Sequence, residues 1–172
     1  AIDVNSRQYL VTAKHVVKNF GASGTIHVWH EGCWKSVEMK LVGHSNVDVS
    51  VLAASRSLAY NELQVDLATG GFFLGQDVYF AGFPLGLTGF NFESPFPAPL
   101  VKKAIISGSD GKRFDSAYFL DGHNNPGFSG GPVYLRIPGD SQFSIAMIIS
   151  SFTAMIESGT DGDGHPTGHF VH

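Results

Sequence analysis

One serine of this chain has the setting of a nucleophile. Ser129 lies within DGHNNPGFSGGPVY, residues 121–134, between glycines and directly before an apolar run. Gly127 and Gly130 allow backbone conformations that a Cβ atom would forbid, so N–H groups there can point at a carbonyl oxygen that becomes negative during acyl transfer. An ordinary glycine-rich turn before a strand has the same composition. The serine segment therefore needs partners elsewhere before it indicates catalysis.

A base and an orienting carboxylate are both available, and a serine hydroxyl needs them because it is otherwise a weak nucleophile. His15 ends the apolar run YLVTAKHVV, and Asp48 begins the β-like run NVDVSVL. Each alone is better explained as a structural histidine or a turn aspartate. An unpaired carboxylate is costly to bury at the start of a strand, however, and an imidazolium would offset that cost. Taken in chain order, histidine, aspartate and serine match one of the convergent catalytic triads.

The elements that must position these residues are predicted to be short strands. The 172 residues suit one globular unit, 43% of them are hydrophobic and 21 are glycine, and no segment keeps a helical period over a dozen residues. Apolar, β-branched runs alternate with Gly, Asn, Asp and Pro clusters, which is typical of an all-β sandwich or pair of barrels. Residues 13–19 are expected to form one helical turn. The predicted strands cover residues 8–12, 25–29, 33–42, 49–53, 77–82, 100–107, 117–120, 131–136, 145–152 and 168–171.

Three segments together resemble the trypsin-like (chymotrypsin-fold) serine peptidases, in their compact, disulfide-free, HtrA-like form. VTAKHVV is similar to the histidine motif of that family, VDVSVL to its aspartate motif and NNPGFSGGPVY to its serine motif. FFLGQDVYFAGFPLGL, residues 72–87, is similar to the strand and turn that enter the second barrel, and VKKAIISG, residues 101–108, to the strand that follows. The resemblance covers roughly residues 7–171 and implies two antiparallel six-stranded β-barrels with the active site in the cleft between them.

The resemblance also implies a division of labour. His15 is the general base, Asp48 holds its tautomer, and the N–H groups of Gly127 and Ser129 form the oxyanion hole; no metal or organic cofactor is involved. The substrate is a polypeptide, and its pocket is expected to involve His123, Asn124, Ser150 and Ser151, between residues 122–126 and a stretch near residues 149–152. A small or medium apolar residue is expected before the cleaved bond, with His123 leaving room for an acidic one.

The family resemblance also gives domain limits. Residues 1–172 form a single peptidase domain, with an N-terminal barrel over residues 1–81, a connection over 82–99 and a C-terminal barrel over 100–172. Natural sequence is expected to be missing at both ends, because the family places more chain before its histidine motif and after its last strand. Phe128 stands where digestive trypsin-like enzymes have an aspartate that pairs with a new N-terminus. Activation through that ion pair is therefore not expected.

Other readings make different predictions. GFSGG also satisfies the G-x-S-x-G elbow of α/β-hydrolases, with partners among Asp161, Asp163, His165 and His169, but that elbow needs a helix after the serine. The same acidic and histidine side chains, with His172, lack the spacing of a known metal site, and residues 159–169 are expected to form a hairpin tip. A protease-like fold that only binds peptides is a third possibility, although no triad residue is lost.

Charge and hydropathy exclude several functions. The formal net charge of −4 argues against a surface built for nucleic acid or anionic membranes, and no apolar run is long enough to span a bilayer. The single cysteine, Cys33, cannot form an internal disulfide, so two small barrels would be held by core packing alone. Export to the periplasm or outside the cell is expected from the family resemblance. The sequence carries no indication of the oligomeric state.

Overall fold

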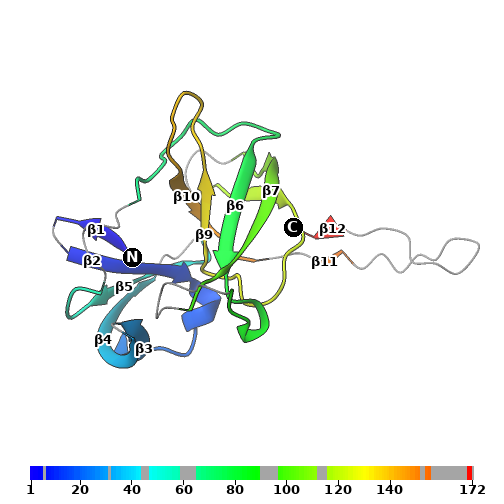
Figure 1. The fold of residues 1–172 in the computed structure, drawn as a ribbon. Coiled ribbons are helices and arrows are strands. Elements are labelled where there is room, and N and C mark those ends of the chain that lie inside the picture. Colours follow the sequence, from blue (N-terminus) through cyan, green and yellow to red (C-terminus); the bar gives the residue numbers. More distant parts are fainter. Residues whose placement is uncertain are drawn as a thin grey trace, which may run out of the picture.

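The computed structural model shows an all-β protein. It describes residues 1–5, 7–30, 32–43, 47–58, 65–89, 97–111, 116–151, 154–155 and 170–171. Within these residues the strands form two five-stranded antiparallel sheets and one two-stranded pair. The two large sheets pack side by side, and in Figure 1 the strands of the first run across those of the second.

The first sheet holds the strands from the N-terminal half, in the order β1-β2-β5-β4-β3. Its strands are β1 (Ile2–Val4), β2 (Arg7–Ala13), β3 (Ser23–His30), β4 (Cys33–Gly43) and β5 (Val49–Ala54). Alternate residues of β4 are buried, and Val37 and Met39 pack there with Leu52 of β5. This alternation is the pattern of a sheet with one face on a core and one in solvent.

The second sheet has the order β10-β9-β6-β7-β8. Its strands are β6 (Asp77–Gly82), β7 (Leu100–Ser109), β8 (Tyr118–Asp121), β9 (Pro132–Leu135) and β10 (Ser144–Ile148). Its core contains Val78, Phe80, Ile106 and Val133, and it also encloses Phe128 from the loop before β9. The serine segment is thus anchored in the core of this sheet.

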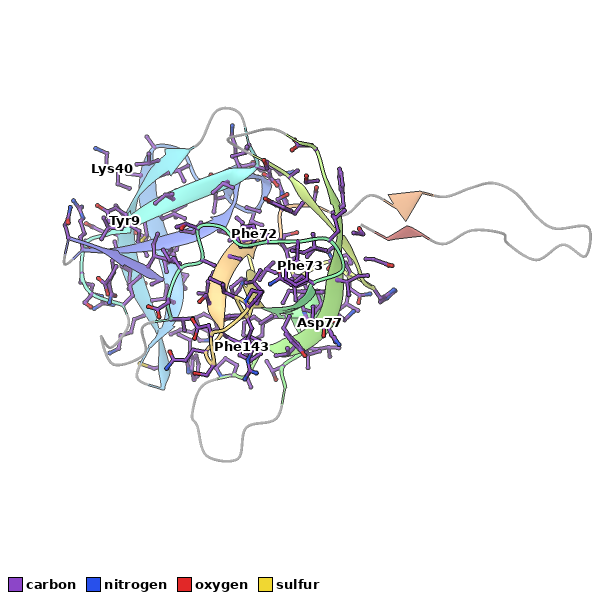
Figure 2. All side chains as sticks on the ribbon, turned by 90° about the horizontal axis from the view of Figure 1, so that it is seen from above. Tyr9, Lys40, Phe72, Phe73, Asp77 and Phe143 are labelled. Carbon is purple, nitrogen blue, oxygen red and sulfur yellow. The ribbon has the colours of Figure 1, made fainter. Side chains whose placement is uncertain are left out.

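Aromatic pairs cover both ends of the second sheet. Figure 2 labels Phe72 and Phe143 on this half of the molecule, and Tyr9 and Lys40 on the first sheet. Phe72 meets Tyr118 edge to face at 5.5 Å, and Phe143 meets Tyr79 in the same geometry at the same distance. Such pairs are favoured by the ring quadrupoles and add to the gain from burying the rings.

The predicted strands agree with the observed ones closely. All ten predicted segments contain a strand, and the predicted helical turn is the 3-10 segment η1 (Lys14–Val17). The sequence did not predict β1 or the two-residue strand β11 (Ala154–Met155), which pairs with β12 (Phe170–Val171). Each large sheet has five described strands where the resemblance implied six. The expected hairpin tip at residues 159–169 lies outside the described residues.

One boundary differs from the expected division of the chain. The expected N-terminal barrel over residues 1–81 includes residues 77–81, but these lie in β6, which pairs with β7 and β9 and so belongs to the second sheet. The physical reason is burial: Val78 and Phe80 complete the core that Ile106 and Val133 form. The chain therefore passes from the first sheet to the second before residue 77. Part of the expected connection at residues 82–99 is described, including the 3-10 segment η3 (Pro84–Gly86).

Candidate active site

His15 and Asp48 form a short, doubly anchored pair. The His15 Nδ1 and Asp48 Oδ2 atoms lie 2.6 Å apart, and the backbone N–H of His15 donates to Asp48 Oδ1 at 2.9 Å. Both side chains are partly exposed, at 47% for His15 and 32% for Asp48. The carboxylate therefore faces the Nδ1 edge of the ring, and its second oxygen is held by the backbone. This arrangement favours the tautomer that carries its proton on Nδ1 and leaves Nε2 free to accept one.

The local fold explains why these two residues meet. Strand β2 pairs with β5 so that Ala13, which is fully buried, lies opposite Val49. The chain leaves β2 directly into η1, and Lys14 N donates to the Asp48 carbonyl oxygen at 3.2 Å. The last pair of the two strands is Ala13 with Val49. His15 is the second residue after Ala13, and Asp48 is the residue directly before Val49. The antiparallel register sets their separation.

The loop before β9 presents Ser129 on a tightly packed backbone. Gly127 has φ +106° and Gly130 has φ +81°, conformations that residues with a Cβ rarely adopt. A Cβ atom on Gly127 would lie 2.5 Å from the carbonyl oxygen of Phe83. The loop is held there because Phe83 N donates to Gly127 O at 3.1 Å and Leu85 N donates to Pro126 O at 3.2 Å.

Gly130 brings the serine loop against the strand that ends at the histidine. A Cβ atom on Gly130 would overlap the hydroxyl oxygen of Thr12 and lie 3.1 Å from Ala13 N. Gly130 N also donates to the carbonyl oxygen of Ile149 at 2.6 Å, which ties the loop to the segment after β10. The structure thus packs Gly130, the residue after Ser129, against the end of the strand that leads into His15. No hydrogen bond joins the Ser129 hydroxyl to the imidazole between these two described residues.

Two backbone N–H groups of the serine loop have no partner among the described residues. Within the described part of the chain, the N–H groups of Gly127 and Ser129 donate no hydrogen bond to the protein. Phe128, the residue between them, is fully buried and meets Phe80 edge to face at 5.0 Å. Its burial fixes the peptide units on either side, so both donors are held without being used. Such a pair is suited to stabilise a developing oxyanion.

A cleft of about 480 Å³ opens beside this loop. Its lining includes Asp48 and the residues next to it in the chain, together with residues of β8, β9 and β10. Of the four residues expected in a substrate pocket, Asn124, Ser150 and Ser151 line the cleft. His123 does not line it; its side chain is exposed, and its carbonyl oxygen accepts a hydrogen bond from Lys102 Nζ at 3.0 Å.

Sequence reasoning overlooked Lys102 and the apolar lining of the cleft. Lys102 lies in β7 at a position that shares its face with Leu100, Ala104 and Ile106, all of them partly or fully buried. A lysine on the inward face of an alternating strand is unusual, because its charge needs partners there. The alternation of inward and outward positions in VKKAII could have indicated that Lys102 is on the inward face.

Other candidate sites are not supported in the described residues. The chain after Ser129 turns and enters β9 instead of a helix, so the α/β-hydrolase elbow is wrong. The side chains proposed for it and for a terminal metal site, Asp161, Asp163, His165, His169 and His172, lie outside the described residues. Among those described, no group of three or more His, Cys, Asp or Glu side chains could hold a metal ion. No described helix is long and apolar enough to cross a membrane.

The comparisons with known proteins agree with this architecture. The profile of the trypsin-like peptidase domain family matches residues 2–136. This chain therefore belongs to the family of trypsin-like peptidase domains. No curated protein sequence matches it significantly.

Solved structures show where the fold recurs. The MamO protease domain from Magnetospirillum magneticum, in its apo form, is 16% identical with a TM-score of 0.51, over 96% of this chain and 77% of that one. The HtrA-type protease AlgW, solved with a tripeptide, is 21% identical with a TM-score of 0.55, over 99% of this chain and 50% of that one. This chain thus spans half the length of the AlgW structure. At these identities the likeness concerns the fold alone, and it confirms the two-sheet architecture of the trypsin-like fold.

Proposed function

We propose that this peptidase domain is a serine endopeptidase that works through an acyl-enzyme. The observation that carries the proposal is the His15–Asp48 pair at 2.6 Å, with the serine loop packed against the strand that leads into His15. In the proposed reaction His15 Nε2 takes the proton of Ser129 Oγ while the oxygen attacks the peptide carbonyl. The imidazolium then gives that proton to the leaving amine, and water releases the acyl group by the same route.

The remaining residues have matching roles in the proposal. Asp48 accepts the Nδ1 proton and stabilises the imidazolium as it forms. The unpartnered N–H groups of Gly127 and Ser129 bind the oxygen that becomes negative in the tetrahedral intermediate. The lack of a hydrogen bond between the described Ser129 and His15 side chains does not count against the proposal, because such bonds often form only when substrate is bound.

A fluorophosphonate probe tests the proposal directly. Wild-type protein is expected to gain the mass of one phosphonyl group on Ser129, because only an activated serine reacts quickly with this electrophile. Intact-mass spectrometry followed by peptide mapping measures the adduct and its position. Heat-unfolded protein is the control, since it keeps the serine but loses the site. A folded protein that stays unlabelled while an unrelated serine hydrolase reacts would favour the alternative, a catalytically silent peptide-binding module.

We further propose that the cleft receives an apolar side chain of the substrate. Phe72, Phe80, Val133 and Met147 are among its lining residues, and His123 is not. Burial of an apolar side chain there gains roughly 25 cal/mol for each Å² removed from water.

A peptide library digested by the wild-type protein and read by mass spectrometry is therefore expected to show cleavage after medium-sized apolar residues such as Val, Leu or Met. The same digest with Ser129→Ala identifies cuts made by contaminants. Preferential cleavage after Asp or Glu would contradict this proposal and would favour His123 as a counter-charge.

A further inference from the structure

The ammonium of Lys102 makes all its described polar contacts with the loop that leads to the serine. Its Nζ atom donates to the His123 carbonyl oxygen at 3.0 Å and to Asn125 Oδ1 at 2.5 Å. It also lies 5.2 Å from the centroid of the Phe128 ring, a distance at which the ring quadrupole attracts a cation. One side chain of β7 therefore contacts three positions of the six-residue stretch from His123 to Phe128.

These contacts lie on both sides of the peptide unit that carries the Gly127 N–H and directly before the unit that carries the Ser129 N–H. Asn125 lies two residues before Gly127, and Phe128 separates Gly127 from Ser129. Phe128 contacts both Phe80, whose ring it meets edge to face, and the Lys102 cation. Since Phe80 and Lys102 are direct partners across β6 and β7, the two contacts come from one rung of the sheet. This cross-strand pair thereby fixes the distance between the loop and the sheet.

The site of the lysine explains why this contact holds. Lys102 is half-buried, and its position in β7 is on the inward face. A partly desolvated ammonium needs acceptors, and hydrogen bonds to a charged group are worth more than those between neutral groups. The neighbouring Lys103 points outward and pairs with Asp77 at 2.8 Å, and this hydrogen bond raises the pKa of the exposed Lys103 ammonium. The strand thus offers two adjacent lysines of which only one contacts the loop.

We propose that Lys102 is a positioning residue that holds the loop at residues 123–128 in the conformation in which the Gly127 and Ser129 N–H groups point at the reacting carbonyl. The proposal rests on the peptidase function proposed above and adds a residue outside the triad. The contacts between Lys102 and the loop join two parts of the same chain, so no cleavage of the chain is needed for them to form. It acts through Asn125 and Phe128 and does not touch the substrate.

The experiment compares Lys102→Met with Lys103→Met, which removes the same charge one residue away. Active sites are first titrated with the fluorophosphonate probe, so that kcat is expressed per functional site. Lys102→Met is expected to lower kcat about 10- to 100-fold with little change in KM, because small displacements of oxyanion donors act on the transition state. Lys103→Met is expected to keep wild-type kcat. Lys102→Arg, which retains a cation with several donors, is expected to recover most of the loss.

Amide hydrogen exchange supplies a readout that does not depend on catalysis. The peptide that covers residues 122–131 is expected to exchange faster in Lys102→Met than in Lys103→Met, while peptides from the first sheet exchange alike. Coupling gives a further check: adding Asn125→Ala to Lys102→Met is expected to lower kcat by much less than the two single effects combined, since both remove the same contact.

The outcomes separate the two proposals. An active wild-type protein whose Lys102→Met variant keeps both kcat and loop protection overturns the positioning role and leaves the peptidase function intact. If Lys102→Met loses activity only because fewer sites are titrated, the positioning role is also overturned, because Lys102 then contributes to stability alone. A wild-type protein without labelling or hydrolysis overturns the peptidase function and with it the positioning role of Lys102 in catalysis; the exchange data would then report only whether the contact orders the loop.

Discussion

Ser129→Ala is expected to lower turnover of casein or a peptide substrate by about 10⁶ and to leave the fold unchanged. The loss follows from the proposed covalent step, which has no other nucleophile at this position. The hydroxyl makes no hydrogen bond within the described structure, and an alanine fits the half-buried position. The free energy of unfolding should therefore change by less than about 1 kcal/mol. Steady-state hydrolysis and thermal unfolding measure the two effects.

Ser141→Ala is the matched control for this variant. Ser141 is exposed in the turn between β9 and β10, far along the chain from the loop of Ser129. Its loss should leave both turnover and labelling at the wild-type level. Hydrolysis that persists in highly purified Ser129→Ala, at a rate near that of the wild type, would show that Ser129 is not the nucleophile.

Asp48→Asn is expected to lower kcat by about 10⁴ without disturbing the backbone around His15. The reason lies in the two contacts of the carboxylate. The His15 backbone N–H requires an acceptor at Oδ1, so the asparagine oxygen takes that place and its NH₂ group faces Nδ1. The NH₂ group can only donate, which makes Nδ1 the acceptor and moves the ring proton to Nε2. A protonated Nε2 cannot take the proton from the serine.

Asp66→Asn provides the control, because it makes the same change of charge at an exposed position outside both sheets. NMR of imidazole protons in the two variants can follow the tautomer of His15 independently of turnover. A kcat for Asp48→Asn within tenfold of the wild type would contradict the orienting role. A loss of kcat with the Nδ1 proton still present would contradict the explanation by tautomer.

The sequence predicts the strands well because each carries its own alternation and ends in turn residues. In β4 and β7 the buried residues alternate with exposed ones, so periodicity alone identifies both strands. The short edge strand β1 escapes this reasoning, since only three residues pair and none is buried. The same is true of the boundary near residue 77, where pairing with β7 and β9 decides which sheet receives β6. Local sequence contains no information on that choice.

The candidate site follows a similar rule. Motif order was sufficient to nominate His15 and Asp48, and the structure brings these two together because β2 and β5 pair in one register. The contacts of Lys102 join β7 to a loop more than twenty residues later, and no spacing in the sequence announces them. His123 shows the same limit of prediction from sequence. Its distance from Ser129 along the chain is known, but the conformation of the loop decides whether its side chain faces the cleft.

Gly130 makes the proposed site depend on the packing of the two sheets against each other. This residue touches Thr12 and Ala13 of the first sheet while its N–H is bonded to Ile149 beside the second. The proposed triad is therefore divided between the two sheets, with His15 and Asp48 beside the first and Ser129 beside the second. In the proposed mechanism, a chain in which both sheets were folded but not packed together would contain all three triad residues without bringing them together. Under this proposal, hydrolysis depends on the contact between the two sheets, and its rate would report their packing more sensitively than any measure of β-structure.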